Sequence, residues 1–150
     1  MCPPSDFVAH GSSRFEARGQ VLILHSVGPF NAEHILSLAE PFRYWAARLR
    51  QDGPWASVNV VTASAMCTPE AIQALRVSAQ RSFDLLGRVA MGYVIDLDVE
   101  GRRVMEPALR GSCAGIMPLE IFETVDPAVA WAELRIAAAR ATPDDAPIRA

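Results

Sequence analysis

The spacing of hydrophobic and polar residues along the chain predicts alternating strands and helices. Residues 14–18 alternate with a period of two, Gly19 and Gln20 offer a turn, and residues 21–27 form an apolar run of strand length. This pattern predicts an opening β-hairpin whose second strand lies deep in a sheet. Further strands are expected where apolar runs recur, at residues 55–62, 89–95 and 119–123.

Helix signals lie between these strands. Asn31 is suited to cap a helix that begins at residue 32, and Pro41 is expected to kink that helix or divide it in two. Thr68 then serves as the N-cap of a second helix, which Gly87 ends. This second helix has the clearest signals in the chain.

Two more helices are expected in the last third of the chain. Residues 98–109 are moderately helical, and the final helix is predicted from Asp126, as its N-cap, to about residue 141. The side chains of that last helix expected to face inward are Ala130, Trp131, Leu134, Ala137 and Ala138.

A hairpin followed by helix–strand units predicts an α/β fold. The sheet is expected to be mixed and five-stranded, antiparallel at its start and parallel afterwards, with about four helices. We expect one domain at residues 13–141, between a loosely held arm at residues 1–12 and a frayed tail at residues 142–150. With 51% hydrophobic residues among 150, the chain can bury a core of its own.

Composition excludes several classes of function. The formal net charge is −3 and the basic residues are spread along the chain, which argues against a nucleic-acid-binding surface. All 14 basic residues are arginine, so a lysine Schiff base and a P-loop lysine are both excluded. The 3 cysteines are widely spaced and are expected to be free thiols. No signal peptide or transmembrane segment is apparent, so the expected location is the cytoplasm.

Several short segments give the chain a resemblance to a known family. Residues 13–135 resemble the STAS-like family, which is related to bacterial anti-sigma-factor antagonists and whose fold is likened to the lipid-binding SEC14 domain. The segments that carry the resemblance are Gly28-Pro29-Phe30-Asn31, Thr68-Pro69-Glu70-Ala71, Gly87-Arg88-Val89-Ala90, and Phe122 with Ala130-Trp131. The resemblance implies a STAS-like sheet and a regulatory role through protein contacts.

The family's phosphorylation motif is not intact in this chain. Anti-sigma-factor antagonists carry an acid, a phosphorylated Ser or Thr and a Gly where the third strand meets the second helix, and here both the acid and the Gly are missing. Ser64 and Thr68 are the nearby hydroxyls that could accept a phosphate or contact a partner. Thr68 is also well explained as a helix cap.

A ligand site is expected beyond the carboxyl ends of the parallel strands, where open α/β sheets bind ligands. The residues expected at this rim are Thr62, Met66, Asp96 and Asp98. Residues 96–101 resemble half of a calcium loop, but Pro107 stands where its bidentate glutamate is required. The sequence therefore identifies no metal site and no cofactor.

Two residues, Cys113 and His25, are candidates for catalytic groups. Cys113 lies in a Gly-x-Cys-x-Gly segment that follows a helix, whereas a nucleophile elbow must follow a strand. His25 lies in an apolar strand without a nearby partner in sequence. We therefore predict no catalytic residue.

These observations lead to two functional hypotheses. The first is a non-enzymatic regulatory or protein-interaction module of STAS-like fold, with an unidentified protein partner. The alternative is a carrier of a small apolar ligand or lipid in a SEC14-like pocket, which a content of 5 methionines would suit. The sequence leaves homodimer formation open.

Overall fold

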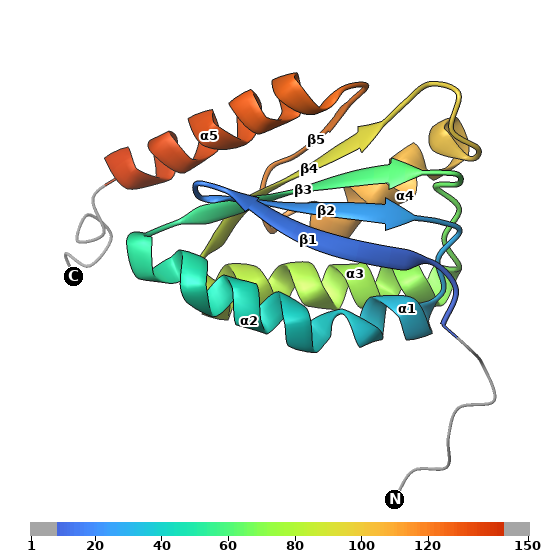
Figure 1. Cartoon of the computed structure of the whole chain (residues 1–150), viewed down its shortest axis with the longest axis horizontal. Helices are drawn as coiled ribbons and strands as arrows, with labels where there is room; N and C mark the ends of the chain where they lie inside the picture. Colours follow the sequence, from blue (N-terminus) through green and yellow to red (C-terminus); the bar gives the residue numbers. More distant parts are fainter. Residues whose placement is uncertain (1–8, 143–150) are drawn as a thin grey trace, which may run out of the picture.

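The computed structural model describes residues 9–142, which form a five-stranded sheet with helices on both faces (Figure 1). The strands lie in the order in which they occur in the chain: β1 (Ser12–Arg18), β2 (Val21–Val27), β3 (Trp55–Thr62), β4 (Arg88–Ile95) and β5 (Leu119–Phe122). β1 pairs with β2 in the antiparallel direction, and the other neighbours are parallel. The predicted mixed sheet is confirmed.

Five α-helices lie within the described residues, and four of them have seven residues or more. They are α1 (Ala32–Ser37), α2 (Ala39–Leu49), α3 (Pro69–Arg81), α4 (Arg102–Cys113) and α5 (Val125–Ala141). A 3-10 turn, η1 (Arg50–Asp52), follows α2, and a π-helical turn, η2 (Ser82–Leu86), follows α3. None of these helices is both long and apolar enough to cross a membrane.

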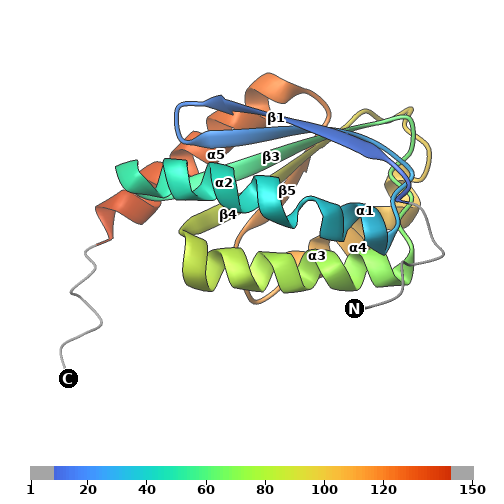
Figure 2. The same ribbon diagram turned by 60° about the horizontal axis from the view of Figure 1, so that its bottom comes forward.

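The helices form two layers around the sheet. α5 covers one face, and α1 to α4 cover the other (Figures 1 and 2). Under α5, the alternate strand residues Val21, Ile23 and Val58 pack against Ala132 and Ile136. The opposite face is divided between a cluster beneath α3 and α4 and a second cluster beneath α2.

The first predicted helix is divided, as expected. α1 ends at Ser37 and α2 begins at Ala39, so Pro41 lies in the first turn of α2, where its missing N–H breaks no hydrogen bond. At the chain ends, residues 1–8 of the predicted arm and 143–150 of the predicted tail lie outside the described residues, and Ser12 already belongs to β1.

The last helix differs from its prediction in cap and in orientation. Its N-cap is Thr124 rather than Asp126, and its buried residues are Ala128, Val129, Ala132 and Ile136. Of the side chains expected to face inward, Leu134 is 69% exposed, whereas Trp131 is half-buried against Phe122. Alanines lie all round this helix, so its apolar pattern does not define the inward face.

Candidate functional site

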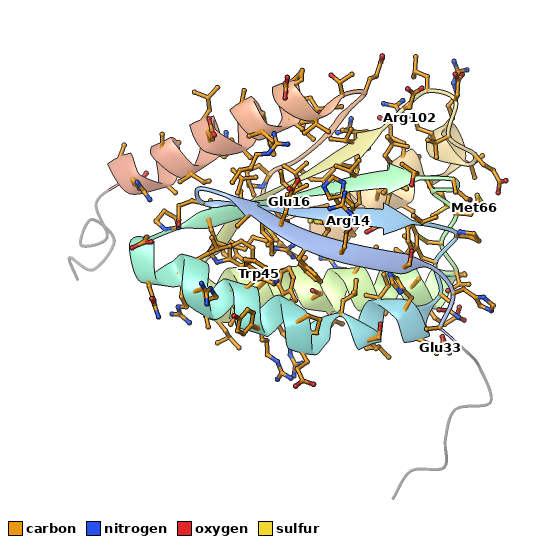
Figure 3. All side chains as sticks on the ribbon, in the orientation of Figure 1. Arg14, Glu16, Glu33, Trp45, Met66 and Arg102 are labelled. Carbon is orange, nitrogen blue, oxygen red and sulfur yellow. The ribbon has the colours of Figure 1, made fainter. Side chains whose placement is uncertain are left out.

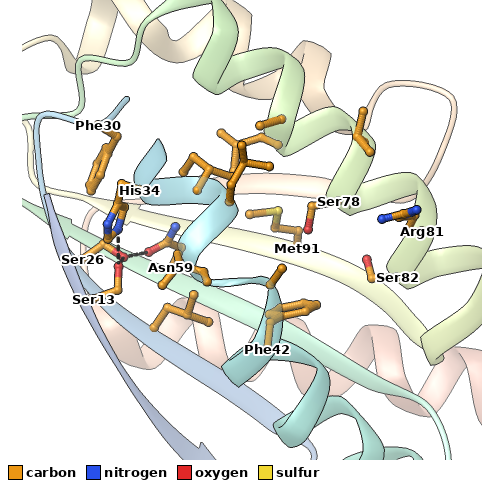
Figure 4. Close-up of a pocket in the computed structure, with 18 of the residues that line it drawn as sticks. Ser13, Ser26, Phe30, His34, Phe42, Asn59, Ser78, Arg81, Ser82 and Met91 are labelled. Atoms are coloured by element: carbon orange, nitrogen blue, oxygen red, sulfur yellow. Dashed lines mark hydrogen bonds between the residues drawn. The ribbon is translucent and has the colours of Figure 1, made fainter. Parts of the chain in front are cut away.

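A cavity of about 490 Å³ lies between the sheet and the helices α1, α2 and α3 (Figure 4). This volume falls in the range of pockets that hold small molecules. Its walls are mainly apolar and come from the strands, from the loop after β2 and from the helices α1, α2 and α3. The apolar side chains that line it include Leu24, Phe30, Ile35, Leu38, Phe42, Val61, Leu75 and Met91.

A polar network lies at one end of the cavity. The Ser13 hydroxyl is 2.9 Å from the Ser26 hydroxyl and 3.0 Å from His34 Nε2, and Ser26 donates a 2.8 Å hydrogen bond to Asn59 Oδ1. Figure 4 shows this network at the end opposite to Arg81 and Ser82. Burial lowers the pKa of His34, whose ring stacks on Phe30. The network therefore offers neutral hydrogen-bonding groups.

Arg88 supplies a buried cation at the other end. This side chain lines the cavity and is only 3% exposed. Its Nε donates to Ser82 Oγ and its Nη1 donates to Ser57 Oγ, both at 2.9 Å, while Met91 Sδ lies 3.9 Å from Nη1. The guanidinium stacks over Phe42 at 5.0 Å from the ring centre. Burial lowers the pKa of Arg88 to about 10, so it stays protonated at neutral pH.

The cavity opens between α1–α2 and α3–η2. Apolar side chains that line it there are largely exposed: Leu36 is 66%, Val77 47% and Leu85 65% exposed. Arg43 and Arg81 also line it and are exposed, and neither forms an ion pair within residues 9–142. The mouth is therefore apolar and cationic.

Tyr93 and the Cys67 thiol line the cavity, whereas Cys113, which is buried in the same apolar cluster, does not. Tyr93 lines the cavity, and its buried hydroxyl has no hydrogen-bond partner among residues 9–142. Burial raises the pKa of Tyr93, of Cys113 and of Cys67, the last to about 11. Cys67 and Cys113 are free cysteines, and both are neutral thiols at physiological pH.

The two hydroxyls proposed for phosphate or partner contact lie outside this cavity. Ser64 is buried; its hydroxyl donates to Glu100 Oε1 at 3.1 Å and accepts from the Met66 N–H at 3.2 Å. Thr68 is exposed and caps α3, accepting a 3.1 Å hydrogen bond from the Ala71 N–H. Only Thr68 is therefore accessible from solvent.

The predicted ligand rim lies beyond the carboxyl ends of β3 and β4. Thr62, Asp96 and Asp98 are exposed there. Met66, which Figure 3 labels at this end of the sheet, is half-buried. None of the four lines the cavity, which extends beneath the face of the sheet instead. Within residues 9–142, no group of three or more His, Cys, Asp or Glu residues is arranged to hold a metal ion.

His25 and Cys113 belong to different faces of the sheet. His25 Nε2 lies 2.9 Å from Glu16 Oε1, and this hydrogen bond lowers the pKa of Glu16. By strand alternation, His25 shares the face of Ile23, which packs against α5. Cys113 is buried in the cluster beneath α3 and α4 on the other face. The two residues do not meet in one site.

The sequence contains a signal for this cavity outside the motifs named above. Ser57 and Asn59 interrupt an apolar strand at alternate positions, so both point to the same face, and Arg88 begins the next strand. Polar residues at the inward positions of buried strands indicate a polar network or a ligand site.

Comparison with known proteins shows a likeness in structure alone. No family model matches the sequence, and no curated protein matches it. A solved structure of an uncharacterised DUF3478-family protein from Shewanella loihica PV-4, described as having a SpoIIAA-like fold, covers 87% of this chain and 99% of its own at 13% identity, with a TM-score of 0.56. An anti-sigma factor antagonist from Mycobacterium paratuberculosis covers 82% of this chain and 94% of its own at 16% identity, with a TM-score of 0.48. The first of these likenesses shows that the chain has a SpoIIAA-like fold, as its resemblance to the STAS-like family implies.

Proposed function

We propose that this protein is a non-enzymatic binding module that holds a small, largely apolar ligand in the cavity between the sheet and the helices α1, α2 and α3. The observation that carries this proposal is the cavity of about 490 Å³ with its apolar walls. It favours the second of the two hypotheses drawn from the sequence.

The exposed side chains at the mouth support the same proposal. Leu36, Val77 and Leu85 are exposed next to the opening, where a bound apolar group would remove them from water. Burial of apolar surface stabilises a complex by about 25 cal/mol per Å². The mouth and the walls thus form one continuous apolar surface that a ligand would cover.

A variant that fills the cavity tests the proposal. Ala74 lies on α3 and lines the cavity, so a phenyl ring introduced by Ala74→Phe would occupy the ligand's space. The probe is N-phenyl-1-naphthylamine, a neutral dye that fluoresces in apolar sites. We expect wild type to bind it and Ala74→Phe to bind it at least tenfold more weakly, which corresponds to about 1.4 kcal/mol.

The matched control is Ala138→Phe, which adds the same ring at an exposed position of α5, on the other side of the sheet. This variant is expected to bind the dye as wild type does. Wild type that binds no dye, or Ala74→Phe that binds it unchanged, would contradict the proposal.

A protein-interaction module is the second candidate. Leu97 and Val104 are 55% and 71% exposed, on either side of the acidic turn that contains Asp98. Exposed apolar side chains beside charged ones are typical of surfaces that contact another protein. Under this proposal, Thr62, Ser64, Met66, Thr68, Asp96 and Asp98 would border the contact surface, and its partner would be another protein or a second copy of the chain.

A further inference from the structure

We infer that the ligand of this cavity is an amphipathic monocarboxylate, whose anionic head pairs with Arg88 and whose apolar tail lies along the cavity walls. This inference rests on the proposed function and adds the chemical class of the ligand. The head is assigned from the hydrogen bonds and charges around Arg88.

Arg88 is a buried cation without a counter-charge. Its Nε and Nη1 donate to the hydroxyls of Ser82 and Ser57, which are neutral acceptors. Nη2 has no hydrogen-bond partner among the described residues, although the side chain is only 3% exposed. Buried charges in folded proteins are normally paired, so this guanidinium lacks the anion that such a position requires.

The charges around the cavity have one sign. Among the described residues that line it, the charged side chains are Arg43, Arg81 and Arg88, and no Asp or Glu is present. The chain as a whole carries a net charge of −3, so this concentration of cations contrasts with the rest of the molecule. Such a cavity attracts anions and disfavours cations.

The arrangement indicates a head group with a single charge. Only Arg88 lies in the buried part of the cavity, since Arg43 and Arg81 are exposed at the mouth. Ser57, Ser82 and the Phe42 ring hold the guanidinium plane in place before a ligand binds. A fixed guanidinium edge matches the planar fork of a carboxylate.

The experiment compares two eight-carbon probes that differ only in the head group, octanoate and 1-octanol. Titration calorimetry on the full chain measures both probes with wild type, Arg88→Met, Arg81→Met and Arg135→Met. Arg135 is exposed on α5, so its variant is a control for the loss of one positive charge.

We expect wild type to bind octanoate at least tenfold more tightly than 1-octanol. Arg88→Met removes this preference and leaves 1-octanol affinity within threefold of wild type, whereas Arg135→Met behaves as wild type. Equal affinity of wild type for the two probes overturns the inference while leaving the proposed function intact. This comparison uses wild type alone, so it does not depend on whether a variant folds. A preference lost in Arg81→Met but kept in Arg88→Met also overturns it, by placing the anion at the mouth. If wild type binds neither probe at millimolar concentration, the proposed function fails as well.

Discussion

The Tyr93 hydroxyl is the single side-chain nitrogen or oxygen within residues 9–142 that is fully buried and has no hydrogen-bond partner. Burying a polar group without a partner costs about 1–3 kcal/mol. The hydroxyl lies on a wall of the proposed ligand site, where a fold optimised for stability alone would be served better by a phenyl ring. At this position, therefore, the ligand-free protein is less stable than its sequence could make it.

We predict that Tyr93→Phe raises the free energy of unfolding by about 1 kcal/mol, because the phenyl ring fills the same space without a hydroxyl to desolvate. Urea denaturation of the ligand-free protein measures the change. The matched control is Tyr44→Phe at a 58% exposed position, where a change within about 0.5 kcal/mol is expected. A loss of more than 1 kcal/mol in Tyr93→Phe would show that the hydroxyl has a partner in solution.

At the scale of elements, the junction of α3 and β4 shows where helical spacing fails as a guide. The 3.6-residue spacing of apolar residues predicts that the buried stripe of α3 continues through Phe83 to Leu86. In the structure, α3 ends at Arg81 and the π-helical turn η2 follows. The wider turn leaves Phe83 44% exposed and buries Ser82, whose hydroxyl accepts from Arg88. Local spacing contains no signal for such a turn, because the turn depends on tertiary contacts.

The loops after β2 and β3 meet in a close backbone contact. The N–H of Gly28 donates to the Thr62 carbonyl at 3.1 Å, and that of Phe30 donates to the Met66 carbonyl at 2.9 Å. A Cβ on Gly28 would lie 1.9 Å from the carbonyl oxygen of Ser64. The contact therefore requires glycine at position 28, because any side chain there would collide with the loop after β3. The position of Phe30 in the cavity wall depends on this contact.

We predict that Gly28→Ala lowers the free energy of unfolding by about 1–3 kcal/mol, since the methyl group forces these two loops apart. The control is Gly111→Ala in α4, where a Cβ would meet nothing within 4 Å. That variant should gain about 0.5–1 kcal/mol from the higher helix propensity of alanine. Thermal and urea unfolding measure both variants, and a Gly28→Ala protein as stable as wild type would contradict the contact.

For the whole molecule, the sequence predicts the sheet but not the place of the cavity. Period-two strands separated by capped helices leave few topologies, and right-handed crossovers reduce them to the observed mixed sheet. The cavity lies where α1–α2 and α3 pass over the same face of the sheet, so its shape depends on tertiary packing, and local sequence signals only the polar residues in its wall, Asn59 and Arg88. The general rule for open sheets predicts a site at the rim of Thr62 and Asp96 instead.

Under the proposed function, Arg88 serves ligand binding at the expense of stability. Burial lowers its pKa from the usual arginine range to about 10, which at neutral pH corresponds to a penalty of roughly 3 kcal/mol on the folded state. The unfolded chain binds this proton more tightly, so the penalty is fully present below about pH 10 and is relieved as the pH rises above this value. An anion at the guanidinium offsets this penalty in the complex.

The most direct test is the free energy of unfolding of wild type and Arg88→Met at neutral pH, each without and with octanoate. Without octanoate, Arg88→Met is predicted to be about 1–3 kcal/mol more stable than wild type, because a buried unpaired charge is removed. At a hundred times its Kd, octanoate should stabilise wild type by about 2.7 kcal/mol and Arg88→Met by at least 1 kcal/mol less. The assignment of Arg88 as the anion-binding residue would be contradicted by two results together. Arg88→Met would be less stable than wild type without octanoate, and octanoate would stabilise both proteins equally.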